Sequence, residues 1–153
     1  MRAAPELPKK VVLDASLAVW AVLPFVSQVD AVDILAGRRQ DEAELVAPMF
    51  WLCETASAVR ALVHGGHITT DDGWRALEDL LALDIQLVSM SAEHMRAAFE
   101  WSIRLGQRRA YDGFYLALAE EIGAELWCAD QRLVTAARQH GVSWVHTVSG
   151  SDA

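Results

Sequence analysis

Short apolar runs rich in β-branched residues alternate with longer segments of helical periodicity along most of this sequence. The apolar runs predict five strands, at residues 10–13, 44–47, 85–88, 125–128 and 143–146. The segments between them predict helices at 15–23, 28–36, 50–64, 71–83, 92–105, 111–122 and 131–140, with a break at Pro24 after the first and the second strand stopped by Pro48. Strands that alternate with helices are typical of an α/β domain, because parallel strands need helical crossovers.

The helix ends carry residues suited to capping. Thr70 and Ser91 precede two of the predicted helices, where a hydroxyl oxygen can accept hydrogen bonds from the free amides of the first turn. Gly65 and Gly66 follow the helix predicted at 50–64 and favour its termination there.

The length of 153 residues fits a single domain with a sizeable core, and 53% hydrophobic residues support that core. We expect residues 1–9 to be a flexible lead-in, residues 10–147 the domain and residues 148–153 a tail. The first ten residues lack the apolar core of a signal peptide, and no apolar stretch reaches membrane-spanning length. The sequence therefore predicts a protein outside the membrane.

The net charge disfavours one class of function, and the cysteine content indicates the cellular compartment. A net charge of −8 disfavours a protein that binds nucleic acid by non-specific phosphate neutralisation, although nucleic acid can still be a substrate where metal ions offset the repulsion. Cys53 and Cys128 both stand in apolar surroundings, which predicts two buried free thiols. Free thiols indicate a reducing, cytoplasmic location.

Four carboxylates stand where apolar residues dominate: Asp14 and Asp130 follow strand-like runs, Glu54 lies inside an apolar helix, and Asp112 opens another helix. An unpaired buried carboxylate is very costly, and no Lys or Arg lies within three residues of Asp14 or Glu54. One shared divalent cation is the simplest way to stabilise all four acids.

The predicted sheet would bring two of these acids together. Asp14 and Asp130 each take the first position past the carboxyl end of a predicted strand. Sites in open parallel sheets form at that edge, near a switch in strand order. If the first and fourth strands are neighbours, roughly 5 Å separates them, and both carboxylates face one crevice.

Each acid also has a structural interpretation. The three aspartates stand where Asp caps helices, which contributes about 1 kcal/mol each. Glu54 has mostly apolar neighbours three and four positions away, so capping does not explain it. Together the acids form an oxygen-donor set, which favours Mg²⁺ or Mn²⁺, whereas no histidine has zinc-like spacing to a cysteine.

Other catalytic patterns are missing from the sequence. It contains no G-x-S-x-G motif, P-loop or dinucleotide-binding glycine motif, which weakens the hydrolase-triad, nucleoside-triphosphatase and Rossmann-cofactor alternatives. A phosphatase of the aspartyl-phosphate type would need a second Asp two positions after the first, where this chain has Ser16.

The motifs resemble a known family. The four acids lie in VVLDAS, in the helix after Ala47-Pro48, in YDGFYLALAE and in CADQRL, and this order is similar to the signature of PIN-domain ribonucleases, especially VapC-type toxins. The resemblance extends from Val11 to about Val145. It implies a three-layer α/β/α fold around a central five-stranded, mostly parallel sheet. It also implies a Mg²⁺- or Mn²⁺-dependent endoribonuclease that leaves 5′-phosphate and 3′-hydroxyl ends.

By motif match the resemblance assigns the catalytic, metal-binding role to Asp14, Glu54, Asp112 and Asp130, with Ser16 as a supporting hydroxyl. Two positions depart from the family pattern. Cys128 stands where a Thr or Ser hydroxyl is common, and Gly113 stands where Ala is common, which predicts a looser first helical turn.

The same resemblance suggests the partners. Just before Asp112, three basic residues could hold RNA phosphates, although a solvated helix end explains them equally well: Arg104, Arg108 and Arg109. A small antitoxin is the expected protein partner. We also expect a homodimer, because apolar residues gather near the end of the first helix, at Trp20, Val22, Leu23 and Phe25. The alternative is a catalytically silent PIN-like interaction module.

Overall fold

The computed structural model describes residues 9–23, 37 and 42–147. The predicted helix at 28–36, most of the lead-in, the tail at 148–153 and Phe25 lie outside the described residues. The described elements follow one another in this order: β1 (Lys10–Leu13), α1 (Ala15–Val22), β2 (Glu44–Pro48), α3 (Trp51–His64), α4 (Thr70–Leu81), β3 (Gln86–Val88), α5 (Ala92–Arg104), α6 (Tyr111–Ile122), β4 (Glu125–Cys128), α7 (Gln131–Gln139) and β5 (Val145–Thr147).

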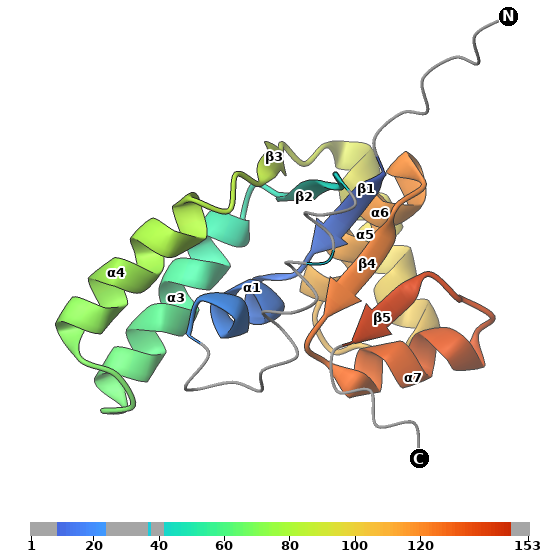
Figure 1. Ribbon diagram of the computed structural model, residues 1–153. Coiled ribbons are helices and arrows are strands. Elements are labelled where there is room, and N and C mark those ends of the chain that lie inside the picture. The colour runs from blue at the N-terminus through green and yellow to red at the C-terminus, as the bar shows by residue number, and fades with distance from the viewer. Residues whose placement is uncertain (1–8, 24–36, 38–41, 148–153) are drawn as a thin grey trace, which may run out of the picture.

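The five described strands form one sheet in the order β3-β2-β1-β4-β5, and every neighbouring pair is parallel. The expected neighbours, β1 and β4, are paired with Val12 opposite Leu126. From β1 through β2 to β3, the chain proceeds toward one edge of the sheet. It then crosses back past β1 and proceeds through β4 to β5 at the opposite edge. Because crossovers are right-handed, the helices of these two halves cover opposite faces of the sheet. In Figure 1, α5 and α6 lie behind β1 and β4.

The centre of the sheet is the core of the domain. Val11, Val12 and Leu13 are at most 1% exposed, and Leu126 is fully buried. Both faces of these strands are covered by helices, which is why their sequences are continuously apolar rather than alternating. The predicted α/β/α arrangement is therefore confirmed, with a sheet that is wholly parallel among the described strands.

Several predicted boundaries were wrong by one or two residues. The N-cap of α4 is Thr69 rather than Thr70, because Thr69 forms a reciprocal capping box with Asp72. Pro48 is the last residue of β2 and pairs with Val88 rather than ending the strand before it. Proline is tolerated there because the ladder continues through the Met49 amide, which donates to the Val88 carbonyl.

Helices α5 and α6 approach each other unusually closely at Gly113. A Cβ at this position would lie 2.2 Å from the carbonyl oxygen of Ala98 and 2.9 Å from Oγ of Ser102. The glycine therefore permits tight packing of α5 on α6. The main effect of Gly113 is therefore this close packing, rather than the looser first helical turn that the sequence predicts.

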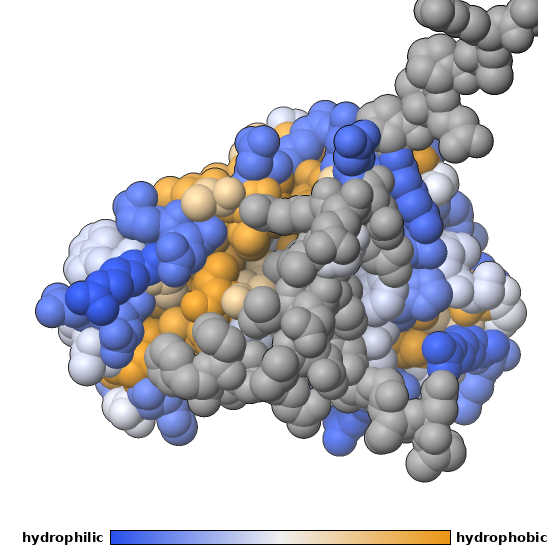
Figure 2. All heavy atoms as spheres, viewed as in Figure 1, coloured by the Kyte–Doolittle hydropathy of each residue, from blue (hydrophilic) through white to orange (hydrophobic). Residues whose placement is uncertain are grey.

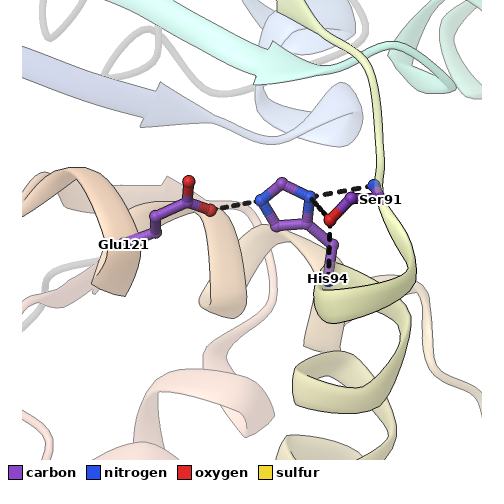
Figure 3. Close-up of polar contacts among 3 residues, drawn as sticks. All are labelled: Ser91, His94 and Glu121. Atoms are coloured by element: carbon purple, nitrogen blue, oxygen red, sulfur yellow. Dashed lines mark hydrogen bonds and ion pairs between the residues drawn. The ribbon is translucent and has the colours of Figure 1, made fainter.

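A polar cluster joins the start of α5 to the end of α6 (Figure 3). Ser91 caps α5 by accepting from the His94 amide, and the Ser91 amide donates to Nδ1 of His94. The opposite ring nitrogen of His94 contacts the Glu121 carboxylate from α6. This capping box satisfies free amides at the start of α5, and the contact with Glu121 ties that start to the end of α6.

The surface carries several exposed apolar side chains. Large exposed hydrophobic residues include Trp74 and Leu81 on α4, and Met95, Phe99 and Ile103 on α5. Figure 2 shows an apolar band across the region of α3 and α4. No helix among the described residues is long and apolar enough to cross a membrane.

Candidate active site

Two of the predicted acids lie at the carboxyl ends of β1 and β4. Asp14 directly follows β1, and its amide donates a 3.0 Å hydrogen bond to the Trp127 carbonyl on β4. Asp130 lies two residues past the end of β4, not one as predicted, because Ala129 intervenes. The chain leaves β1 toward β2 on one side and returns as β4 on the other. This point is therefore the topological switch where ligand sites form in such sheets.

Both aspartates cap helices as well. The Asp14 carboxylate accepts a 2.8 Å hydrogen bond from the Leu17 amide at the start of α1. Asp130 accepts from the amides of Arg132 and Leu133 at the start of α7. The prediction that these two aspartates cap helices is thus correct. Capping is compatible with a role for the same carboxylates in metal binding. Capping occupies one carboxylate oxygen in each case and fixes the acid at the sheet edge.

The third acid is brought to this edge by aromatic packing between α3 and α6. Phe50, just before α3, contacts three rings of α6 edge-on, with centroid distances of 5.5–5.8 Å, namely Tyr111, Phe114 and Tyr115. One turn after Phe50, Oε1 of Glu54 accepts a 2.8 Å hydrogen bond from the Tyr115 hydroxyl. Glu54 is half-buried, so its carboxylate points toward α6 rather than freely into water.

The fourth acid, Asp112, lies one turn before Tyr115 on α6. Its charge interacts with the charges of the other acids and shifts their pKa values. Burial and then the charge of Asp130 raise the pKa of Asp112 above its ordinary value. Burial also raises the pKa of Glu54, and the charge of Asp112 adds to that effect. Acids from four separate elements therefore influence one another at a single edge of the sheet.

Asp14 is the most strongly perturbed acid. Burial is the largest cause that raises its pKa from 3.8 to about 7; the charges of Asp112 and Glu54 contribute to this rise, and the amides of Leu17 and Ala129 oppose it. The residue as a whole is only half-buried, but its carboxylate is enclosed between the loops that follow β1 and β4. A carboxyl group with this pKa exchanges its proton readily near neutral pH, as functional acids often do.

The donor chemistry at this edge fits a hard divalent cation. All four side chains offer carboxylate oxygens, which Mg²⁺ and Mn²⁺ prefer. Within residues 9–23, 37 and 42–147, however, no three His, Cys, Asp or Glu side chains are close enough to enclose an ion. Mg²⁺ usually retains several waters and needs only one or two direct carboxylates, so a closed protein cage is not required.

Cys128 lies beneath the acids at the end of β4. Its thiol is fully buried and contacts the carbonyl oxygens of Asp130 and His146 at 3.7 and 3.5 Å. Burial, followed by the charge of Asp14, raises the pKa of this thiol, which therefore remains protonated and can donate. The other cysteine, Cys53, is exposed, so the prediction that both thiols are buried was wrong. The exposed side of α3 carries Cys53 despite its apolar neighbours.

The predicted supporting residues Ser16 and Arg104 form no hydrogen bond or ion pair with the four acids among the described residues. Ser16 is exposed in the first turn of α1, two residues after Asp14. Arg104 stacks on the Trp101 ring at 4.8 Å and donates to the His140 carbonyl at the end of α7. Asp130 caps the opposite end of that nine-residue helix, about 13 Å away at 1.5 Å per residue. The structure therefore does not bring Arg104 to the acids.

Arg108 and Arg109 lie in the connection between α5 and α6, close in sequence to Asp112. Both are exposed, and neither forms an ion pair within the described part of the chain.

The sequence analysis missed Tyr115 as a member of this site. Its phenol is 2% exposed and hydrogen-bonds Glu54 from a different helix. A signal was present, because a tyrosine three residues after Asp112 lies on the same helix face. Nothing in the sequence showed that this face meets Glu54.

The fold and the acidic edge define a PIN-like α/β protein, and comparison with known families agrees. The PIN domain family model matches residues 11–139. The chain therefore belongs to the PIN-domain family. A search of curated proteins finds no match.

Solved structures share this fold at low sequence identity. PAE2754 from Pyrobaculum aerophilum is 20% identical, with a TM-score of 0.63, and the match covers 92% of this chain and 90% of that one. VapBC2 from Rickettsia felis, bound to a promoter DNA fragment, is 13% identical, with a TM-score of 0.64 and coverages of 90% and 98%. VapC20 from Mycobacterium tuberculosis, a toxin that cleaves the sarcin–ricin loop, is 17% identical, with a TM-score of 0.59 and coverages of 82% and 94%.

Proposed function

We propose that this protein is a divalent-metal-dependent endoribonuclease and the toxin of a VapBC-type toxin–antitoxin pair. The observation that carries the proposal is the electrostatic coupling of Asp14, Glu54 and Asp112, which reach one edge of the sheet from separate elements. Membership of the PIN-domain family and structural similarity to VapC toxins support the same activity.

The four acids have distinct positions that suggest distinct roles. Asp14 and Asp112 would be the main ligands of Mg²⁺ or Mn²⁺, and the more exposed Asp130 would complete a metal position toward the substrate. A bound divalent ion supplies charge neutralisation at a phosphate and lowers the pKa of water. Glu54, held by Tyr115, would orient or deprotonate the attacking water.

RNA requires positive charge in a chain whose net charge is −8. Arg108 and Arg109 are the best-placed candidates, since both are exposed just before α6 and are not paired with acids of the described residues. A guanidinium can bind phosphate through two hydrogen bonds. We leave Arg104 out of this role because its guanidinium is engaged with Trp101 and His140.

Cleavage of a labelled RNA with Mg²⁺, with Mn²⁺ and with a chelator tests the activity. We expect cleavage with either ion, none with the chelator, and fragments with 5′-phosphate ends. Mapping the ends of cellular RNA after brief induction would then identify the target. Full cleavage in the presence of the chelator would contradict a metal-dependent nuclease.

The alternative function is a catalytically silent interaction module, which would bind no divalent ion. Direct measurement of Mn²⁺ binding separates the two. A nuclease should bind Mn²⁺ and lose binding on Asp14→Asn, whereas a silent module should bind neither ion at useful concentrations.

We also propose a homodimer, but through a different surface from the predicted one. Leu23 is 3% exposed, whereas Trp20 and Val22 are only partly buried against the core, so the described residues of the predicted patch offer little apolar surface. Helix α5 instead exposes Met95, Phe99 and Ile103 at four-residue spacing, with 58%, 64% and 65% of each residue accessible. Such a stripe lies along one face of a helix and is suited to pairing with a second copy. Light scattering at micromolar concentration should show a dimer that Phe99→Glu converts to a monomer.

An antitoxin partner would offer an apolar helix and a basic side chain that competes with the metal. The groove between α3 and α4, about 410 Å³ in volume, is a candidate for the apolar part, with Val59, Val63, Trp74 and Leu77 among its lining residues. The similar structures from Rickettsia felis and Klebsiella pneumoniae are toxin–antitoxin assemblies, which supports a partner of this kind. Co-expression with the neighbouring small reading frame should suppress the RNA cleavage.

A further inference from the structure

Tyr115 lies at the centre of the candidate site without being one of its acids. Its side chain is 2% exposed, and its ring packs edge-on against Phe50 at a centroid distance of 5.6 Å. Its hydroxyl donates to Oε1 of Glu54 at 2.8 Å and also interacts with the backbone amide of Ala15, the residue after Asp14. One buried hydroxyl therefore connects α6 with α3 and with the start of α1.

Glu54 needs such a connection to stay at the site. Its side chain is long and half-buried, and Tyr115 supplies the only hydrogen bond that it receives within the described residues. The negative charge of Asp112 repels it from the same side. A flexible carboxylate under this repulsion gains both entropy and hydration by turning toward solvent.

We propose that Tyr115 is a positioning residue, which holds the Glu54 carboxylate beside Asp14 and Asp112 against their mutual repulsion. This inference rests on the proposed nuclease function. Asp112 and Tyr115 are three residues apart on α6 and so share one helix face, which keeps the hydroxyl in register with the acids. Partners that orient ligating side chains commonly change metal affinity or activity about 10–100-fold.

Replacing Tyr115 by phenylalanine isolates the hydroxyl, because the ring and its packing on Phe50 are kept. Tyr111→Phe is the matched control, since Tyr111 also packs edge-on against Phe50 at 5.8 Å but is 53% exposed. We expect Tyr115→Phe to lower kcat about 10–100-fold with KM for RNA changed less than about twofold. Tyr111→Phe should match the wild type, and both variants should melt cooperatively. Equal kcat values for the two variants would overturn the proposal.

A second arm asks whether Tyr115 acts through Glu54. In a Glu54→Gln background, Tyr115→Phe should cause no further loss of kcat, because the carboxylate that the hydroxyl positions has already been replaced by an uncharged amide. A full additional loss would assign Tyr115 a separate packing role and would overturn the positioning role.

A third arm does not depend on RNA cleavage at all. Crystal structures of the metal-free wild type and Tyr115→Phe should show Glu54 held toward α6 in the first and released in the second. An unchanged Glu54 in the variant would overturn the inference even in an active enzyme. Failure of the wild type to bind Mn²⁺ would instead overturn the proposed function, and the Glu54 position would still decide the role of Tyr115.

Discussion

The backbone amide of Asp14 donates a 3.0 Å hydrogen bond to the carbonyl oxygen of Trp127, across 113 positions of sequence. This bond continues the β1–β4 ladder one residue beyond Leu13, which pairs with Trp127 in the sheet. It fixes the Asp14 carboxylate beside the loop that carries Asp130. The site therefore depends on the register of β1 and β4.

Asp14→Asn should melt higher than the wild type without metal at about pH 8, because it removes a charge that is costly to bury there. Asparagine can still accept the hydrogen bond from the Leu17 amide, so the helix cap is kept. Mn²⁺ at about 100 times its dissociation constant should stabilise the wild type by roughly 2.7 kcal/mol, or about 5–10 °C, and the variant hardly at all. A variant that melts lower in both conditions would show that Asp14 acts mainly as a helix cap.

The metal-free protein should become less stable as the pH rises from about 4 to about 7. Asp14 ordinarily ionises near 3.8, but in the folded state its pKa is raised to about 7. Within this interval the folded chain holds a proton that the unfolded chain has lost, so the free energy of unfolding falls with rising pH. One such group contributes a slope of at most about 1.4 kcal/mol per pH unit. Urea titrations across the interval check this, and Asp14→Asn should flatten the slope.

Mn²⁺ affinity should follow the opposite trend and rise with pH up to about 7, because Asp14 must release its proton to bind a cation. Calorimetry in buffers of different ionisation enthalpy should detect this proton release below pH 7 and its disappearance above it. An affinity that stays constant from about pH 5.5 to about pH 7.5 would separate Asp14 from metal binding.

Asp112→Asn should abolish RNA cleavage, by at least about 100-fold, without unfolding the protein. The change keeps the size of the side chain and removes the negative charge beside Asp14. Asp71→Asn is a matched control, because Asp71 is likewise the second residue of its helix but is exposed and remote from the site. Cleavage at the wild-type rate by Asp112→Asn, with unchanged circular dichroism, would remove Asp112 from the site.

Gly113→Ala should destabilise the protein by about 3 kcal/mol or prevent its folding. The added Cβ would lie 2.2 Å from the Ala98 carbonyl oxygen, so α5 would have to move as a whole. Gly73→Ala is the comparison, since its Cβ would meet side-chain methyls rather than backbone, of Val63 at 2.8 Å and of Val59 at 3.6 Å. Both changes gain about 1 kcal/mol of helix propensity, so the difference between their unfolding curves reports the clash.

The sequence by itself determined the local elements and the identity of the acids. Parallel strands buried on both faces must be continuously apolar, as Val11–Leu13 are, and helical periodicity then locates the segments between strands. Asp14 and Asp130 were recognisable because an acid one or two residues after such a strand lies at the sheet edge. The capping box of Thr69 and Asp72 was also readable from its spacing, although Thr70 was chosen instead.

Only the tertiary structure decided which side chains meet. The pairing of β4 with β1 depends on how the chain crosses the sheet. The contact of Tyr115 with Glu54, across 61 positions, depends on the angle at which α3 and α6 pack. Such angles follow from the sum of many weak contacts, including the space left by Gly113, and no local pattern encodes them. The same limit applies to apolar surface, because the exposure of Phe99 and the burial of Leu23 are decided by the neighbours that packing supplies.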